Sequence, residues 1–270
     1  MQDGPLEQEN RDADPPARRP SRRARRSRNR RRRRPGPATV AFAVPLAAFA
    51  YFLAAPALPA LGAGDPTVLV AGGIGLLMVA ASTLALLPAR ETLIGPLLIV
   101  LGSGLLVAAL NSASVGAGAN VFEAFLAGCA GLLFARWLAA PIVAVAVPLF
   151  VAAIDVWSVA SGPSSRLLAG GTDSVDALSF DLPAWGHMGS AGHLGLSDAL
   201  FVSMFAAWAW RYDLRRWWTL GGITLGLIGS LVLGVALDRA IPAIPLIAAG
   251  YLLANLDRLG RLLHPEGQVE

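Results

Sequence analysis

The sequence predicts an all-α, polytopic helical membrane protein with about eight transmembrane helices. Three observations predict this class. Hydrophobic residues make up 55% of the 270 residues, and only 15% are charged. The mean hydropathy is +0.57. The apolar residues also gather in runs of about 20, the length that an α-helix needs to cross the hydrocarbon layer. This composition excludes an ordinary soluble globular domain.

Eight apolar runs meet the length expected for a transmembrane helix. They cover residues 38–61, 66–88, 92–111, 119–137, 140–160, 194–212, 217–237 and 240–256. We divide them into an N-terminal group of four spans (38–138) and a second group of four (139–258) that includes a long loop at 161–193. Residues 259–270 are predicted to form a C-terminal tail. The division between the fourth and fifth spans is the least distinct, because only Arg136 and Pro141 interrupt the apolar run there.

The first apolar run also has features of a secretory signal peptide. The segment APALPALGAG contains small residues that resemble a cleavage site. The run from Ala38 to Leu61 is longer than an ordinary signal-peptide core, however, so we favour a retained helix.

A basic tail precedes the first span. Of the 22 arginines, 13 lie between Arg11 and Arg34, and the chain has no lysine. The tail, residues 1–37, has almost no large apolar side chains, so we predict that it is disordered. Its arginine run could bind anionic lipid or nucleic acid. We favour a topogenic signal that keeps the N-terminus in the cytoplasm, and expect no specific nucleic acid partner.

The other arginines test this orientation. With the tail inside and eight spans, the inner segments hold seven of them: Arg90, Arg136, Arg211, Arg215, Arg216, Arg258 and Arg261. The outer segments hold Arg166 and Arg239. This agrees with the positive-inside rule. The sequence therefore predicts a multi-pass protein with both termini in the cytoplasm, in the plasma membrane if the source is bacterial, and with the loop 161–193 outside.

Two aspartates fall inside predicted spans at the same depth. Asp155 lies about five residues before the end of the fifth span, and Asp198 about four residues after the start of the sixth. With a rise of 1.5 Å per residue, both lie roughly 6–8 Å below the outer surface. Ionisable groups in a bilayer are costly, which favours a functional role.

Two prolines interrupt the start of the last span at that level. Pro242 and Pro245 lie in the segment AIPAIPLI, and each lacks an N–H and disfavours regular helix. Irregular backbone at this depth is tolerated where it faces protein or a wet cavity. We therefore expect non-helical backbone close to the two acids.

These three stretches resemble the presenilin and signal peptide peptidase family of intramembrane aspartyl proteases. The matching segments are IDVWSV at 154–159, LGLSD at 194–198 and PAI at 242–244. The Arg-Tyr-Asp sequence at 211–213 also looks like one that signal peptide peptidases carry. The resemblance covers roughly residues 140–256 and implies a presenilin-like helical bundle. The predicted orientation matches signal peptide peptidases, and presenilins are inverted.

The sequence departs from the family pattern at three positions. Ile154 stands where the family usually has tyrosine, Ser197 where it has glycine, and Ile244 where it has leucine. The family also usually has nine spans. A catalytically inactive relative therefore stays open as an alternative.

The resemblance implies that Asp155 and Asp198 form the catalytic pair. It also implies a substrate-binding set made of Gly195, Leu196, Ser197, Pro242, Ala243 and Ile244. The substrates would be single-span membrane proteins or signal-peptide remnants within the lipid bilayer, and no cofactor is expected. Two carboxyls at close range do not both ionise easily, so they would titrate as one unit. A substrate helix must unwind, and the segment ALSFDLP at 177–183 could add a short strand beside it.

Other interpretations remain. The acids could bind protons or cations in a non-enzymatic transporter, although the first four spans show no repeat of them. A prepilin-peptidase-like enzyme is a third possibility. His193 and Ser197 could share a helix face as a dyad, which we disfavour. His187, with Asp173, Asp176 and Asp181, crowds the external loop without a spacing typical of metal ligands.

Overall fold

The computed structural model describes residues 37–62, 64–113, 115–161, 179–187, 189–239 and 241–263. The predictions for the basic tail, for Arg166 and for Asp173 and Asp176 lie outside these residues. Chain contacts separate residues 1–36 from a second unit, Pro37–Glu270, to which all of the following refers.

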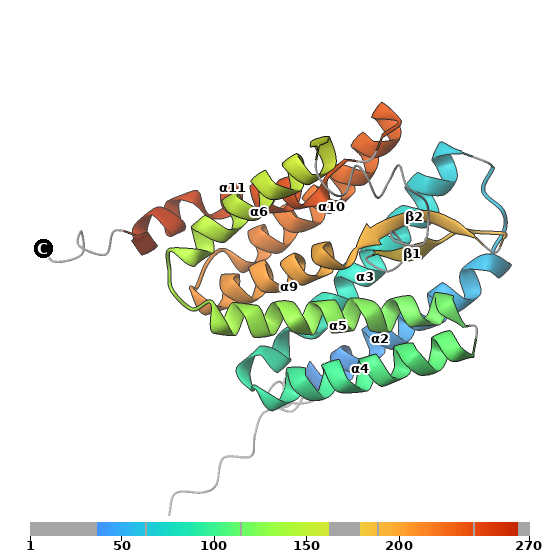
Figure 1. Ribbon diagram of the computed structural model, residues 1–270, viewed down its shortest axis with the longest axis horizontal. Helices are drawn as coiled ribbons and strands as arrows, with labels where there is room; N and C mark the ends of the chain where they lie inside the picture. Colours follow the sequence, from blue (N-terminus) through green and yellow to red (C-terminus); the bar gives the residue numbers. More distant parts are fainter. Residues whose placement is uncertain are drawn as a thin grey trace, which may run out of the picture. The chain divides into compact units, whose positions relative to one another are not determined.

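The second unit is mostly helical (Figure 1). Its α-helices are α2 (Pro37–Ala54), α3 (Gly73–Ala85), α4 (Ile94–Ser112), α5 (Gly116–Trp137), α6 (Val143–Ser161), α9 (Leu196–Arg211), α10 (Arg216–Leu237) and α11 (Ala243–Leu263). The short helical segments are η1 (Ala55–Ala57), η2 (Thr67–Gly72) and η3 (Leu87–Glu91). Strands β1 (Ser179–Pro183) and β2 (Ser190–Gly195) form an antiparallel hairpin. The helical prediction is therefore confirmed, but the label all-α is wrong in detail because it omits this hairpin.

Five helical segments of the described part are long and apolar enough to cross a membrane. They are Thr67–Glu91, Ile94–Ser112, Gly118–Trp137, Val143–Ala160 and Arg216–Leu237. These segments agree with the prediction of a helical membrane protein. Helix α9 has only 16 residues, and the last turns of α11 carry the polar residues Asn255, Asp257, Arg258 and Arg261, so neither meets the same criterion. The count of eight spans stays a prediction.

Several predicted ends were wrong. Helix α2 ends at Ala54, before the predicted end at Leu61, because Pro56 and Pro59 follow it and disfavour continued helix. Helix α9 starts at Leu196 because the two residues before it belong to β2. Helix α11 runs to Leu263, five residues beyond the predicted boundary at 258.

The helix α9 lies at the centre of the core. It packs on α5, which also contacts α4 on its other side (Figure 1). Aromatic rings join α9 to α11: Phe205 stacks on Tyr251 with a centroid distance of 5.0 Å and on Trp208 at 5.9 Å. All three side chains are buried. The burial of α9 positions its first turn, which carries Asp198, inside the bundle.

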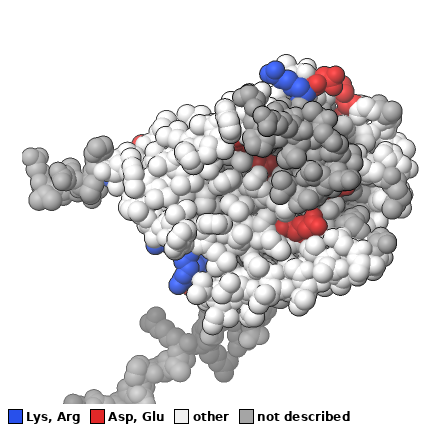
Figure 2. All heavy atoms as spheres, viewed as in Figure 1, with Lys and Arg blue, Asp and Glu red and all other residues white. Residues whose placement is uncertain are grey.

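Helices α4, α6 and α10 have largely exposed apolar surfaces. Figure 2 shows that one face of the molecule consists mainly of uncharged residues, with acidic and basic side chains at a few places. An exposed apolar surface of this extent fits contact with lipid. Helix α6 packs mainly on α11, so Asp155 reaches the site from the periphery of the bundle.

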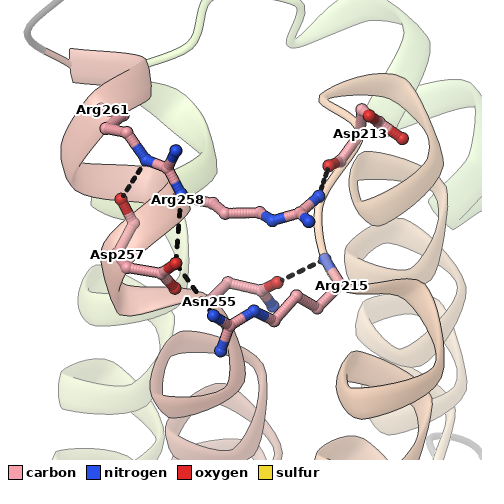
Figure 3. Close-up of polar contacts among 6 residues, drawn as sticks. All are labelled: Asp213, Arg215, Asn255, Asp257, Arg258 and Arg261. Carbon is pink, nitrogen blue, oxygen red and sulfur yellow. Dashed lines mark hydrogen bonds and ion pairs between the residues drawn. The ribbon is translucent and has the colours of Figure 1, made fainter.

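A polar cluster ties the turn between α9 and α10 to the last turns of α11 (Figure 3). The buried amide Oδ1 of Asn255 accepts the backbone N–H of Arg215 at 2.9 Å. The Arg215 and Arg261 guanidinium groups contact the Asp257 carboxylate at 3.0 and 3.2 Å. The guanidinium of Arg258 donates to the backbone carbonyl of Asp213. Three helix ends are thereby held in one arrangement.

The Asp257 carboxylate is poised to keep these ion pairs at neutral pH. Loss of hydration acts to raise its pKa, but the Arg215 guanidinium, backbone N–H groups and Arg261 together hold the pKa below its usual value. A lowered folded-state pKa means that the pairs are present above the ordinary carboxyl pKa and are lost only as the pH falls through the lowered value.

Candidate functional site

A cavity of about 660 Å³ brings both predicted acids together. Its walls come from the end of α6, the hairpin, the start of α9, the end of α10 and the start of α11, together with residues around η2. Asp155 and Asp198 both line it, although they are 43 residues apart in the sequence.

Asp198 is held by the start of its own helix. Strand β2 ends at Gly195, which is the N-cap of α9, and Asp198 is the third helical residue. Its Oδ2 accepts the Gly195 N–H at 3.2 Å, as an acidic residue at this position does in a capping box. The residue is 9% exposed. A side chain at position 195 is disfavoured, because a Cβ at Gly195 would lie 3.2 Å from that same Oδ2.

Asp155 is held by the opposite wall of the cavity. It lies six residues before the end of α6, and its Oδ2 accepts the backbone N–H of Ile244 at 3.2 Å. Ile244 is the second residue of α11, where a backbone N–H has no partner within the helix. The PAI segment therefore contacts the first acid through a main-chain donor.

The effect of the two prolines is partly different from the prediction. Pro242 precedes α11 and lies in non-helical backbone that lines the cavity, as expected. Pro245 is the third residue of the helix and does not disrupt it. A proline is tolerated in the first turn because the N–H that it lacks would have no helical acceptor there.

The hairpin supplies the wall in front of α9. The strand predicted within 177–183 is present as β1, whereas β2 was missed. Glycine is depleted in strands, so the sequence SAGHLG gave little signal for one. Phe180, Leu182 and Leu194 are buried and lie on the same face of the hairpin, so this face packs on the core.

His193 lies on β2 and is one of the residues that line the cavity. The carbonyl of Asp181, on β1, accepts the side-chain amide of Asn120 from α5, so it points away from β2. Asp181 pairs with His193 in the register, and both members of such an antiparallel pair direct their N–H and C=O groups outward. The backbone of His193 therefore presents these groups on the edge of β2 that pairs with no other strand among the described residues, which we call the free edge of β2, at a residue that lines the cavity.

The structure also places polar residues that sequence analysis did not assign to the site. His193 Nδ1 contacts Asp181 Oδ1 at 2.7 Å across the hairpin. His193 and Ser197 do not share a helix face, in agreement with our disfavouring that dyad, because His193 lies in β2 and Ser197 in α9. Asp65, Asp238 and Arg239 line the same cavity. These residues follow no motif and come from segments far apart in the sequence, so the sequence did not indicate that they share one cavity.

Four residues of the predicted substrate-binding set line the cavity: Gly195, Ser197, Pro242 and Ala243. The other two do not. Leu196 packs against the core, and the Ile244 side chain is buried, so Ile244 contributes its N–H alone.

Removal of the Ile244 N–H should reduce peptide cleavage without abolishing it. In Ile244→Pro the donor to Asp155 is lost, while the first-turn position accepts proline as Pro245 does. We expect peptide cleavage to fall about 10- to 100-fold, because a charge-assisted hydrogen bond of roughly 1.5–3 kcal/mol no longer positions the carboxyl.

Ile244→Val is the matched control, since it keeps the N–H and most of the buried volume. Equal activity of the proline and valine variants, measured with the same peptide, would show that the main-chain donor has no role.

No protein-family model matches the chain, and no curated protein or solved structure matches it.

Proposed function

We propose that this chain is an intramembrane aspartyl endopeptidase that hydrolyses peptide bonds in transmembrane segments or signal-peptide remnants. One observation carries the proposal: Asp155 and Asp198 line one cavity, where the Ile244 N–H holds the first acid and the Gly195 N–H holds the second. A carboxyl pair in a cavity among apolar helices suits acid–base chemistry on a peptide carbonyl. Cleavage of a single-span peptide that requires both acids is the test.

The reaction needs one proton shared between the two carboxyls. The ionised carboxylate accepts a proton from a water molecule while the oxygen of that water attacks the scissile carbonyl carbon. The protonated carboxyl donates its proton to the carbonyl oxygen. Collapse of the tetrahedral intermediate breaks the C–N bond, and a proton passes to the leaving amine. Because the two groups titrate together, the acid and base roles belong to the pair rather than to one residue.

A transmembrane substrate must be unwound to react, since helical carbonyls are already hydrogen-bonded. The free edge of β2 at His193 supports a binding mode in which the unwound segment adds as a strand beside the hairpin. Pro242 and Ala243 lie on the α11 side of the cavity and would flank that segment. The orientation predicted from the arginines would open this cavity toward the outer surface.

Blocking the free edge of β2 should impair substrate binding. In His193→Pro the edge loses its N–H, yet no hydrogen bond of the hairpin is lost, because the His193 N–H does not point to β1. We expect KM to rise about 2- to 10-fold with kcat reduced less, since one main-chain hydrogen bond to substrate is worth about 0.5–1.5 kcal/mol.

His193→Ala keeps the N–H but removes the imidazole and its contact with Asp181. If the alanine variant raises KM as much as the proline variant, the imidazole rather than the strand edge binds the substrate.

A further inference from the structure

One end of the bundle gathers arginines from separate elements. Arg136, at the end of α5, donates to the Glu91 carbonyl of η3 at 3.4 Å, and Glu91 pairs with Arg90 at 3.0 Å. Arg211, at the end of α9, lies 3.5 Å from the carbonyl of Ala135 on α5. These contacts join the ends of α5 and α9 to η3.

The same contacts continue to α10 and α11. The guanidinium carbons of Arg90 and Arg216 lie 5.8 and 5.5 Å from the ring centroid of Trp210. Arg216 pairs with Asp213 at 3.2 Å, and Asp213 accepts Arg258 from α11 (Figure 3). We call this set the arginine end; its arginines are Arg90, Arg136, Arg211, Arg215, Arg216, Arg258 and Arg261.

The carboxylates at the arginine end do not balance its charge. Among the described residues of these contacts, Glu91, Asp213 and Asp257 face seven arginines. A guanidinium has five N–H donors, so each paired arginine keeps donors for a further acceptor. The excess of positive charge favours an anionic partner.

The arginine end also carries exposed aromatic side chains. Trp217 and Trp218, in the first turn of α10, are 81% and 74% exposed. Tryptophan at the end of an apolar helix is typical of the headgroup level of a bilayer. The 22-residue apolar helix α10 starts beside them. The cations are therefore at the level where lipid phosphates lie, which favours a lipid over free phosphate.

We propose that the arginine end binds the phosphate groups of anionic phospholipids, with Arg90 and Arg216 as the central pair. These two cations come from different elements and each lies within 6 Å of the centroid of the same indole ring, so a phosphate accepted by both would also tie η3 to α10. Basic pockets between membrane helices bind lipid headgroups in this way. The proposal goes beyond the peptidase function and does not depend on it, since Arg216 begins α10 whereas the cavity adjoins the other end of that helix.

Native mass spectrometry of the full chain in neutral detergent tests the proposal. We expect phosphatidylglycerol to bind at least tenfold more tightly than phosphatidylcholine. The double variant Arg90→Gln/Arg216→Gln should weaken phosphatidylglycerol binding about 20- to 30-fold, because each arginine near an anionic headgroup contributes about fivefold. Excess inorganic phosphate should displace the lipid only weakly.

The matched control removes two charges from the tail by Arg32→Gln/Arg33→Gln and should leave the lipid preference unchanged. Arg261→Gln is a milder variant, whose 67%-exposed side chain can be shortened without disturbing the core, and it should weaken binding about fivefold. Equal binding of the two lipids would overturn the proposal. So would a preference that follows the tail variant, a preference that neither arginine-end variant changes, or full displacement by phosphate.

Discussion

Replacement of either Asp155 or Asp198 by asparagine is expected to reduce cleavage of a single-span peptide by about 1,000-fold or more. Positioned acid–base groups contribute about 100- to 10,000-fold each, and a carboxyl pair that shares one proton loses its function when either member is neutralised. The measurement is cleavage of a panel of fluorogenic single-span peptides by purified protein reconstituted in lipid vesicles.

Asparagine is the appropriate replacement because it preserves the local structure. In Asp198→Asn the new amide oxygen can still accept the Gly195 N–H, and in Asp155→Asn it can still accept the Ile244 N–H. Loss of activity with an unchanged thermal midpoint would therefore be a loss of chemistry. Asp238→Asn is the matched control, since Asp238 lines the same cavity and its left-handed backbone, φ 47°, suits asparagine.

The outcomes separate the candidate functions. Cleavage that survives both asparagine variants would place the activity at another site. Failure of the wild type to cut any peptide, combined with proton or cation uptake that needs both acids, would favour a transporter. Neither result would affect the lipid proposal, which is measured by binding alone.

The sequence could predict the helical class and the proximity of the two acids because both depend on local pattern. Apolar runs of about 20 residues leave few alternatives to helices in a bilayer. Two acids at equal distances from the ends of consecutive antiparallel spans must lie at one level. The structure brings Asp155 and Asp198 to one cavity, in agreement with that expectation.

The hairpin could not be predicted with the same certainty, because it depends on tertiary contacts. Strand β1 has the alternating apolar pattern of a half-buried strand, whereas β2 contains two glycines and no β-branched residue. Its pairing depends on packing of Leu194 and Leu182 against the core. The cavity residues Asp65 and Asp238 lie far apart in sequence, so only the fold could relate them.

The Ile244 N–H bond to Asp155 illustrates the same limit. The sequence predicts irregular backbone near the acids, but its pattern does not specify which N–H lacks a helical acceptor. The start of α11 decides it, because the first N–H groups of any helix lack internal partners. Pro245, which looked disruptive, is compatible with that first turn.

Gly250→Ala is expected to destabilise the bundle by about 2–3 kcal/mol, since overpacking a close contact costs roughly 1–3 kcal/mol and backbone cannot easily yield. A Cβ at Gly250 of α11 would meet the backbone of Gly222 on α10, and a Cβ at Gly222 would meet that of Gly250. The two helices approach closely only because both positions lack side chains. The measurement is the thermal midpoint in detergent.

Gly221→Ala is the matched control on the neighbouring position of α10, where an added Cβ meets nothing within 4 Å. It should leave the midpoint unchanged or slightly raised, because alanine is the better helix former. Gly250→Ala should also lower the peptidase activity of the folded fraction, since displacement of α11 moves Ile244 away from Asp155. If both variants had the same thermal midpoint, Gly250 and Gly222 would lie farther apart than they do in the structure.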